Sequence, residues 1–567
     1  MASESIPQRF DAPPEKKATG ATYTPTELAD FVAEQMLRCW CPPSSGLIRV
    51  LDPAVGDGEL LASLVRRMPR GLKIEIHGFD TNREALSLAR KRLAQCPLSA
   101  NHQLHCADFL SLIADGMPPG GLWHGDSLGK FNLIIANPPY VRTQVLGARS
   151  AQALSAQFGL EGRVDLYQAF VLAIAQALEP RGVTGIIVSN RFMTTKSGAA
   201  VRRSIRRSLR VRRVWDLGDT KIFDAAVLPA VIVAEGGARA SEEPVEFTSI
   251  YETSDPEEVS ASSLTEALGC EGVVSVPGGR RFLVQRGLLP ETGNADEVWR
   301  VANRETDDWL ATVRKNTWAT FRDLGKVRVG VKTCADSVFI RRDWGSLPES
   351  ERPELLRPLT THHIARRYRA SSNGDGCQIL YPHHVNAGKR TAVDIRRHPR
   401  TLAYLEQHRA RLESRKYVLE AGRNWFELWV PQDPGVWPQP KLVFRDISER
   451  PCFWIDKTGS VVNGDCYWLA CGDPAKEDHL WLAVSIANSA FAESFYDRRF
   501  NNKLYAGRRR FITQYVEQFP LLNPVLPIAC RIVELAKQAY AEAGSDDGAV
   551  LEAEIDGLVW EGFGVEH

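Results

Sequence analysis

The sequence has few of the features that mark membrane, secreted or metal-binding proteins. No apolar stretch in its 567 residues reaches the length that crosses a bilayer. Its polar start, residues 1–17, lacks the core of a signal peptide. The eleven cysteines include no Cys-x-x-Cys pair, so we expect reduced thiols rather than zinc ligands or disulfides. These absences predict a cytoplasmic protein that uses no metal and no membrane.

Also missing is a Gly-x-Gly-x-x-Gly fingerprint, which argues against a Rossmann dehydrogenase. The chain has a different glycine turn. Residues 48–52 form an expected buried strand and residues 60–68 an expected helix, with Pro53-Ala54-Val55-Gly56-Asp57-Gly58-Glu59 between them. A strand, a glycine turn and a helix begin a doubly wound nucleotide-binding sheet, because glycine lets the backbone approach a ligand closely.

Two further expected strands run into acidic residues. Residues 74–79 precede Asp80, and residues 103–107 precede Asp108-Phe109. An acid one β-α unit after the glycine turn normally binds the ribose hydroxyls of an adenosine cofactor. Asp108 could bond an adenine amino group while Phe109 covers the ring. Each acid alone is as readily a helix cap or a turn residue, but successive strand ends with this chemistry indicate a cofactor site.

The motif Asn137-Pro138-Pro139-Tyr140 directly follows an apolar expected strand, residues 131–136. Pro138 fixes its own φ and pushes Asn137 out of the helical region, so the strand must end in a stiff loop. The loop offers an amide, a carbonyl and an aromatic ring, which suit a flat substrate bearing an amino group, such as a nucleobase. Alone the motif is as readily a tight turn, and the upstream strand ends favour a site.

In this order the segments resemble the S-adenosylmethionine-dependent DNA amino-methyltransferases of the gamma arrangement, the TaqI- and Eco57I-like adenine methyltransferases. The family's Tyr/Thr-Thr-Pro element matches Tyr23-Thr24-Pro25, and its Asp-x-Pro-x-x-Gly-x-Gly turn matches residues 52–58. The resemblance implies that S-adenosylmethionine is bound by Tyr23, Thr24, Pro25, Asp52, Pro53, Ala54, Gly56, Gly58, Asp80, Asp108, Phe109, Asn137 and Pro139. It implies that Asn137, Pro138, Pro139 and Tyr140 are catalytic, and that Tyr140 and Phe223 stack on an extruded base. Phe223 could instead be an ordinary apolar plug.

The resemblance implies sequence-specific methylation of adenine N6 in double-stranded DNA, as the modification enzyme of a restriction-modification system. It also implies a prokaryotic protein that associates with the nucleoid. Cytosine N4 is an alternative target, and RNA and protein-glutamine methyltransferases use the same tetrad. A DNA-binding subunit without transfer activity is a further alternative. Too little chain precedes Glu15-Lys16-Lys17 to form a nuclease module, so we expect a cognate restriction endonuclease on a separate chain.

The expected fold class is α/β: a Rossmann-like methyltransferase domain with a mixed, mostly parallel sheet, followed by an α+β target-recognition domain. The expected divisions are a flexible lead-in at 1–20, the catalytic domain at 21–240 and the target-recognition and C-terminal region at 241–567. Within the last region, residues 327–333 and 338–340 suggest a hairpin, and residues 441–444 and 466–469 suggest strands.

A nearly neutral total charge of +1 does not exclude DNA, since a nucleic-acid enzyme needs only a local basic surface. Arginines recur at helical spacing between residues 202 and 213, and three more are adjacent at 508–510. A solvated helix face is the alternative interpretation. The candidates for phosphate contacts are Arg202, Arg206, Arg508, Arg509 and Arg510.

Overall fold

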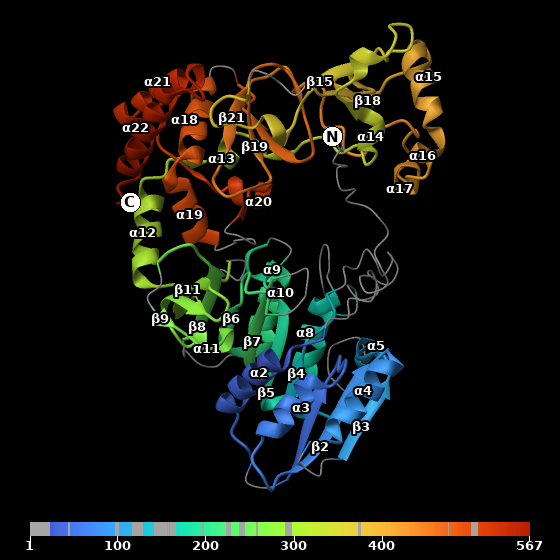
Figure 1. Ribbon diagram of the computed structural model, residues 1–567, viewed down its shortest axis with the longest axis vertical. Helices are drawn as coiled ribbons and strands as arrows, with labels where there is room; N and C mark the ends of the chain where they lie inside the picture. Colours follow the sequence, from blue (N-terminus) through green and yellow to red (C-terminus); the bar gives the residue numbers. More distant parts are fainter. Residues whose placement is uncertain are drawn as a thin grey trace. The chain divides into compact units, whose positions relative to one another are not determined.

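The computed structural model describes residues 23–43, 46–96, 101–115, 129–140, 156, 158, 166–195, 198–222, 228–237, 244–256, 259–289, 298–371, 376–473, 476–500 and 508–566. These residues form two compact units. The main part of the first ends at Asn303, and the second begins at Arg304. Each unit has its own core and is described by itself (Figure 1).

The first unit is built on one large sheet with helices on both faces (Figure 1). Its strands are β1 (Leu47–Asp52), β2 (Lys73–Asp80), β3 (Asn101–Cys106), β4 (Phe131–Ala136), β5 (Leu178–Ser189), β6 (Leu209–Asp216), β7 (Pro229–Gly236), β8 (Glu246–Glu252), β9 (Val259–Ser260), β10 (Gly272–Val276) and β11 (Arg280–Leu288). Its helices are α2 (Thr26–Cys39), α3 (Glu59–Arg67), α4 (Arg83–Leu93), α5 (Phe109–Asp115), α8 (Leu166–Ala177), α9 (Arg191–Thr194), α10 (Ala199–Ser208) and α11 (Leu264–Ala267).

The strand order is β3-β2-β1-β4-β5-β7-β6-β8-β11-β10-β9. The five strands β1 to β5 are parallel to one another, and β7 inserts antiparallel between β5 and β6. Val50 of β1 pairs with Ile76 of β2 on one side and Leu133 of β4 on the other. Parallel pairing requires crossover connections, which the α-helices between successive strands supply. The predicted Rossmann-like, mostly parallel sheet is confirmed.

Helices cover both faces of this sheet, so apolar side chains of one central strand enter two separate cores. Leu133 and Ile135 of β4 lie in the core under α2, α3 and α4, whereas Ile134 lies in the core under α5, α8 and α10. Gly185 of β5 lets α2 approach closely, because a Cβ there would lie 2.5 Å from the Met36 sulfur. The two cores hold the strand ends in a rigid frame.

The second unit is an α+β unit made of small sheets and helices. Its strands are β12 (Ala319–Thr320), β13 (Arg328–Val329), β14 (Ile340–Arg341), β15 (Leu356–Thr360), β16 (Gln378–Leu380), β17 (His383–Asn386), β18 (Lys389–Ala392), β19 (Lys441–Arg445), β20 (Ile447–Ser448), β21 (Phe453–Asp456), β22 (Val461–Val462), β23 (Cys466–Ala470), β24 (Arg509–Arg510) and β25 (Pro520–Leu521). Its α-helices are α12 (Arg304–Lys315), α13 (Phe321–Leu324), α14 (Asp336–Phe339), α15 (Pro399–Gln407), α16 (Arg409–Glu413), α17 (Lys416–Glu420), α18 (Glu477–Asn488), α19 (Ala490–Phe500), α20 (Thr513–Val516), α21 (Pro527–Ala541) and α22 (Asp546–Phe563). Three 3₁₀ helices complete it: η1 (Trp344–Ser346), η2 (His362–Ile364) and η3 (Ile395–Arg397).

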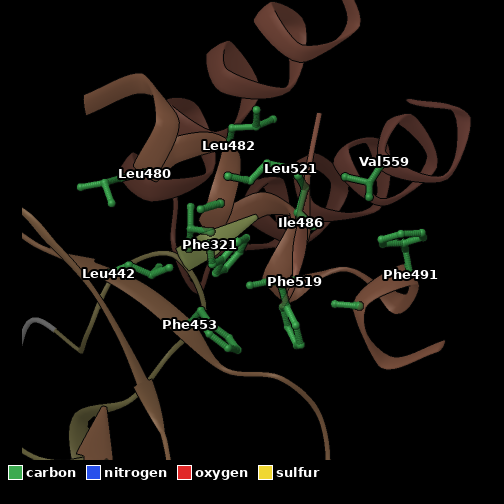
Figure 2. Packing of buried hydrophobic residues seen from close by; sticks show 14 of the residues in the cluster. Phe321, Leu442, Phe453, Leu480, Leu482, Ile486, Phe491, Phe519, Leu521 and Val559 are labelled. Carbon is green, nitrogen blue, oxygen red and sulfur yellow. The ribbon is translucent and has the colours of Figure 1, made fainter. Parts of the chain in front are cut away.

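The larger core of this unit joins the sheet to the C-terminal helices. Phe453 of β21, Ile486 of α18 and Val559 of α22 are buried in the same cluster, drawn in Figure 2. The predicted strands at 441–444 and 466–469 are confirmed as the antiparallel pair β19 and β23. The predicted hairpin at 327–340 is wrong, because β13 pairs with β23, residues 336–339 form α14, and β14 pairs with β16.

The division between the units lies later than the predicted boundary at residue 240. Strands β8 to β11, residues 246 to 288, extend the large sheet beyond β6, because β6 pairs with β8 in parallel. Turn-like composition after β7 therefore marks a loop within the sheet rather than the end of the unit.

Candidate active site

The functional candidates of the first unit gather where its parallel strands end. Strands β2, β1 and β4 are neighbours; Asp80 and Asp52 are the last residues of β2 and β1, and Asn137 directly follows β4. Asp108 follows the adjacent strand β3. Because parallel strands share one carboxyl edge, these sequence-distant groups lie along the same edge of the sheet, which is the usual ligand position in open α/β sheets.

The glycine turn is shaped by two left-handed glycines, Gly56 at φ +52° and Gly58 at φ +83°. A Cβ on Gly58 would lie 2.9 Å from Ala89 of α4, so this position packs tightly against that helix. Among the described residues, a Cβ on Gly56 would meet only the Tyr23 ring, at 3.9 Å. The turn is therefore closed toward α4 and open at Gly56, where a ligand can reach the backbone.

Asp80 ties this turn to the next strand. Its Oδ2 accepts a hydrogen bond from the Gly56 N–H at 2.9 Å, and its Oδ1 accepts one from the Asn82 N–H at 2.8 Å. Asn82 in turn caps α4 by accepting from the N–H of Glu84. A carboxylate has about four acceptor positions. Asp80 is therefore held in place and retains lone pairs for further donors such as hydroxyls.

Asp52, at the end of β1, is fully buried. Its Oδ1 accepts from the Ala54 N–H at 3.0 Å, and its Oδ2 has no hydrogen-bond partner among the described residues. Burial raises the pKa of Asp52 to about 8, and the nearby carboxylates Asp80 and Asp57 add to the rise while the Ala54 N–H opposes it. Asp52 is thus protonated in the folded protein at neutral pH.

This shift predicts a pH-dependent stability. The carboxyl ionises near pH 4 in the unfolded chain but near 8 in the folded protein, so its stabilising contribution is complete below pH 4 and lost as pH rises toward 8. Asp52→Asn keeps an acceptor for Ala54 and cannot ionise. We expect the free energy of unfolding of the variant to rise relative to that of the wild type by about 1 kcal/mol per pH unit between about pH 5 and pH 8. Thermal unfolding across this range measures it, and parallel curves for the two proteins would contradict the assignment.

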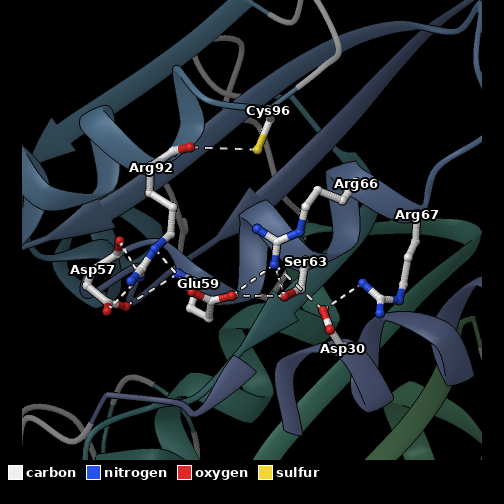
Figure 3. Close-up of polar contacts among 8 residues, drawn as sticks. All are labelled: Asp30, Asp57, Glu59, Ser63, Arg66, Arg67, Arg92 and Cys96. Carbon is white, nitrogen blue, oxygen red and sulfur yellow. Dashed lines mark hydrogen bonds and ion pairs between the residues drawn. The ribbon is translucent and has the colours of Figure 1, made fainter. Parts of the chain in front are cut away.

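A charged network behind the turn was not foreseen from the sequence (Figure 3). Arg92 of α4 bonds the Asp57 carboxylate at 2.6 Å and the Glu59 carboxylate at 3.1 Å. Arg66 holds the other oxygen of Glu59 at 2.9 Å. Glu59 is nearly buried, and a buried carboxylate needs such partners. Arg92 lies more than thirty positions from the turn, so no local pattern pointed to it.

The pair Asp108-Phe109 opens helix α5. Asp108 accepts from the Leu110 N–H at 3.0 Å and from the Ser111 hydroxyl at 2.8 Å, as a helix cap does. Phe109 is 1% exposed and its ring lies 5.4 Å from that of Phe79. The Phe109 ring therefore packs in the core in this structure, and its role of covering an adenine stays a prediction.

Asn137 is held from both sides of its amide. Its Nδ2 donates to the Thr24 hydroxyl at 3.0 Å, and its Oδ1 accepts from the Tyr140 hydroxyl at 3.0 Å. Burial raises the pKa of Tyr140, so the phenol remains a protonated donor. Pro138 is buried, while Pro139 and Tyr140 are partly buried. The loop thus presents a preoriented amide oxygen at the strand edge.

Residues 23–25 lie between the glycine turn and the Asn137 loop and contact both. Tyr23 is half exposed and lies beside Gly56, Thr24 is nearly buried and bonds Asn137, and Pro25 precedes the first turn of α2. The sequence placed all three at the cofactor. The structure brings Thr24 to the Asn137 amide across 113 positions of sequence, and the cofactor role of these residues stays a prediction.

Phe223 lies outside the described residues. The segment leading toward it is anchored by Asp216 at the end of β6, which accepts from the Tyr251 hydroxyl at 2.7 Å and from the Asn190 amide at 2.9 Å. Burial raises the pKa of Asp216 to about 6, although the hydrogen bonds from Asn190, Tyr251 and the Gly218 N–H act to lower it. This buried network was also missed by sequence reasoning.

Most of the predicted phosphate contacts are engaged within the protein. Arg202 is 1% exposed and donates to the carbonyls of Phe192 and Thr195, so it leaves no surface for a phosphate. Arg206 lies over the Trp299 ring. Arg509 binds both oxygens of Asp497 at 2.8 Å, and Arg510 binds Asp446 at 3.0 Å. Only Arg508 of the five is exposed, with the Glu449 carboxylate 3.9 Å from it.

The described part of the chain contains no group of three or more His, Cys, Asp or Glu side chains that could hold a metal ion. It also contains no helix that is both long and apolar enough to span a bilayer.

Comparison with known proteins identifies two family matches along the chain. Residues 75–223 match the Eco57I restriction-modification methylase family, and residues 392–521 match the TaqI-like C-terminal specificity domain. The first match lies in the unit that carries the glycine turn and Asn137, and the second lies in the other unit.

Whole-length relatives agree with these matches. The chain is 37% identical over 575 residues to the type II methyltransferase M.BanIII of Aneurinibacillus aneurinilyticus, covering 97% of this chain and 98% of that protein. It is 24% identical to the type II methyltransferase M.PaeR7I of Pseudomonas aeruginosa, covering 88% and 85%. A similar fold occurs in the type IIL restriction-modification enzyme MmeI, solved in complex with DNA, with a TM-score of 0.60, 14% identity and coverage of 95% and 73%.

Proposed function

Because the chain belongs to the type II DNA methyltransferases of restriction-modification systems, we propose that it methylates the N6 amino group of an adenine in double-stranded DNA, with S-adenosylmethionine as the methyl donor. The observation that carries the proposal is the Asn137 amide, held by Thr24 and Tyr140 beside the glycine turn. The Asn137 amide, which can bind an amino group, thus lies at the same sheet edge as the glycine turn and Asp80, which can bind a nucleoside.

The residues present fit the adenosine and methionine parts of this donor. The backbone at Gly56 is open, and Asp80 has lone pairs left for the two ribose hydroxyls. Asp108 can accept from an adenine amino group, and Asp52 Oδ2 is a buried polar atom still without a partner among the described residues. When bound, S-adenosylmethionine supplies an electrophilic methyl group on a sulfonium, so the protein needs no covalent intermediate.

The task of the protein is to position and activate a poor nucleophile, since the adenine amino lone pair is delocalised into the ring. Tyr140 occupies one lone pair of Asn137 Oδ1 and leaves the other for a substrate N–H. The Pro138 carbonyl is the candidate acceptor for the second N–H. Two fixed acceptors localise the lone pair and stabilise the positive charge that develops on nitrogen, which is electrostatic preorganisation. The surplus proton leaves to water.

A base inside a duplex must first rotate out of the stack, at a cost of a few kcal/mol. Tyr140 and Phe223 are the proposed stacking partners, and base–aromatic stacking offsets about 1–3 kcal/mol per base. The match to a specificity domain supports DNA over release factor or ribosomal RNA as substrate. We propose that a cognate endonuclease on a separate chain is blocked by the methylation, and that no metal or membrane takes part.

The test is to incubate the protein with S-adenosylmethionine and methylation-free DNA, digest to nucleosides and identify them by mass spectrometry. N6-methyladenine is expected. N4-methylcytosine alone would overturn the base assignment, and neither product, with release factor or ribosomal RNA methylated in parallel reactions, would overturn DNA as the substrate.

Thr24→Val should separate cofactor binding from catalysis. Valine has the shape of threonine without the hydroxyl, so the Asn137 amide loses its anchor. A misplaced catalytic group can cost about 10²-fold in rate, so we expect kcat to fall 10- to 100-fold while the affinity for S-adenosylmethionine stays within about twofold. Steady-state kinetics and calorimetry measure the two effects.

Thr24→Ser is the matched control, because it keeps the hydroxyl and should retain most of kcat. A raised Kd for S-adenosylmethionine with unchanged kcat in Thr24→Val would show instead that Thr24 contacts the cofactor.

A further inference from the structure

One strongly basic segment of the second unit runs from Lys389 to Arg423. It holds ten Lys and Arg but only four Asp and Glu, a net charge of +6 where the whole chain has +1. The segment begins in strand β18, passes through η3 and continues through helices α15, α16 and α17 (Figure 1). An exposed basic surface on a nearly neutral protein is the electrostatic footprint of a polyanion, so the exposed cations of this segment are the candidates.

The cations at the start of this segment are exposed and only weakly neutralised. Arg396 and Arg397 have side chains that are 84% exposed, and both approach the single carboxylate of Asp394, at 3.1 and 3.6 Å. Two guanidinium groups sharing one carboxylate leave a positive charge. Lys389 and Arg390, on the hairpin of β17 and β18, are also exposed.

A cavity of about 760 Å³ adjoins these arginines and is lined by groups that donate hydrogen bonds. Arg397, Asn386 and Arg357 line it, and the Arg357 guanidinium lies 5.4 Å over the Tyr381 ring. Planar guanidinium groups match the geometry of phosphate oxygens. The cavity is large enough to hold a nucleotide unit rather than a single ion.

The acids in the lining do not cancel this preference. Glu354 accepts from the Arg400 N–H at 3.0 Å and from the Thr401 N–H and hydroxyl at 2.7 and 2.6 Å, and Asp394 is shared by the arginines.

His383 adds a neutral donor to the lining. Burial lowers its pKa to about 3, and its Nε2 accepts from the Leu428 N–H at 3.2 Å. The ring proton of the neutral imidazole then belongs on Nδ1, which has no hydrogen-bond partner among the described residues. His383 Nδ1 thus adds a donor to the guanidinium groups of Arg357 and Arg397.

We propose that the β17–β18 hairpin, η3 and the adjoining cavity bind the phosphate backbone of double-stranded DNA. The inference rests on the proposed function for its partner. It assigns the contact to residues other than the five arginines expected from the sequence, four of which are buried or engaged within the protein. Contacts to phosphate position a protein on a duplex without reading its sequence. The surface can therefore be tested without knowing the recognition site.

The test measures binding of a random-sequence duplex by fluorescence anisotropy between about 50 and 200 mM salt. Each phosphate contact contributes about 0.9 to the slope of log affinity against log salt. The variant Arg396→Ala/Arg397→Ala should lower this slope by about 2 and weaken binding at 0.1 M salt by at least tenfold. The control is Arg314→Ala/Lys315→Ala, which removes the same charge from exposed positions of helix α12.

A slope unchanged in Arg396→Ala/Arg397→Ala, or lowered equally in the α12 control, would overturn the assignment, since the second result reflects total charge alone. Unchanged thermal unfolding and S-adenosylmethionine affinity establish that the variant is folded. Methylation of DNA by the wild type is measured in parallel. If the wild type methylates and binds DNA while the variant binds equally well, this inference fails and the proposed function stands. If the wild type neither binds nor methylates DNA, the proposed function fails.

Discussion

Replacing Asn137 by alanine should abolish methyl transfer while leaving DNA binding nearly intact. The substitution removes the amide oxygen that receives the substrate N–H, and it leaves the Thr24 and Tyr140 hydroxyls without their partner. Losing one preorganised group at a developing charge costs about 10²–10³-fold in kcat. Because that amide also orients the amine for attack, we expect a loss of 10³-fold or more, measured by single-turnover transfer from labelled S-adenosylmethionine.

Asn132→Ala is the matched control on the same strand. Asn132 lies near the start of β4, where its amide bonds Glu179 at 2.6 Å and the Arg49 N–H at 2.8 Å, away from the strand end that carries Asn137. Its loss should affect stability and leave turnover per folded molecule unchanged. Turnover of Asn137→Ala within tenfold of the wild type would remove this residue from the mechanism.

Asp80→Ala should raise the Kd for S-adenosylmethionine by 10²-fold or more. The carboxylate holds the Gly56 and Asn82 N–H groups and offers its remaining lone pairs to the ribose. Hydrogen bonds to a charged group contribute about 1.5–3 kcal/mol each, so removing the acceptor of both ribose hydroxyls weakens binding by more than two decades. Isothermal titration calorimetry measures the change directly.

Glu75→Ala controls for loss of an acid from the same strand. Glu75 lies near the other end of β2 and pairs with Arg49 at 3.1 Å. Its removal should leave the cofactor Kd within about twofold of wild type. Equal affinities for wild type and Asp80→Ala would exclude Asp80 as the ribose acceptor, whatever the kinetics show.

The catalytic half of the fold was readable from sequence because its signals are local. The strands expected at residues 48–52, 74–79 and 131–136 lie within one residue of the observed bounds of β1, β2 and β4, and the apolar run of β4 reflects a strand buried on both faces. The second unit was less legible. Residues 336–339 have strand-like neighbours, but the Thr333 hydroxyl bonds Asp336 and the Ala335 N–H, and that turn begins helix α14.

Charge was the property least predictable from sequence. Arg202 and Arg509 lie in arginine-rich stretches of the kind that bind DNA. In the structure, Arg202 is buried and donates to carbonyls, and Arg509 is bound to Asp497. Arg396 and Arg397 look no different in sequence and are exposed. Whether an arginine is solvated depends on which carboxylates and carbonyls the fold brings to it, and these lie at unrelated positions in the chain.

The sequence by itself determined the strands β1, β2 and β4, the glycine turn and the identity of the tetrad at residues 137–140, because each depends on neighbours within a few positions. Only the tertiary structure decided how these parts act on one another. It brought Thr24 to the Asn137 amide, Asp80 to the Gly56 N–H and Arg92 to the Asp57 and Glu59 carboxylates. Such pairs join residues 24 to 113 positions apart, and they exist because parallel pairing places successive strand ends at one edge of the sheet.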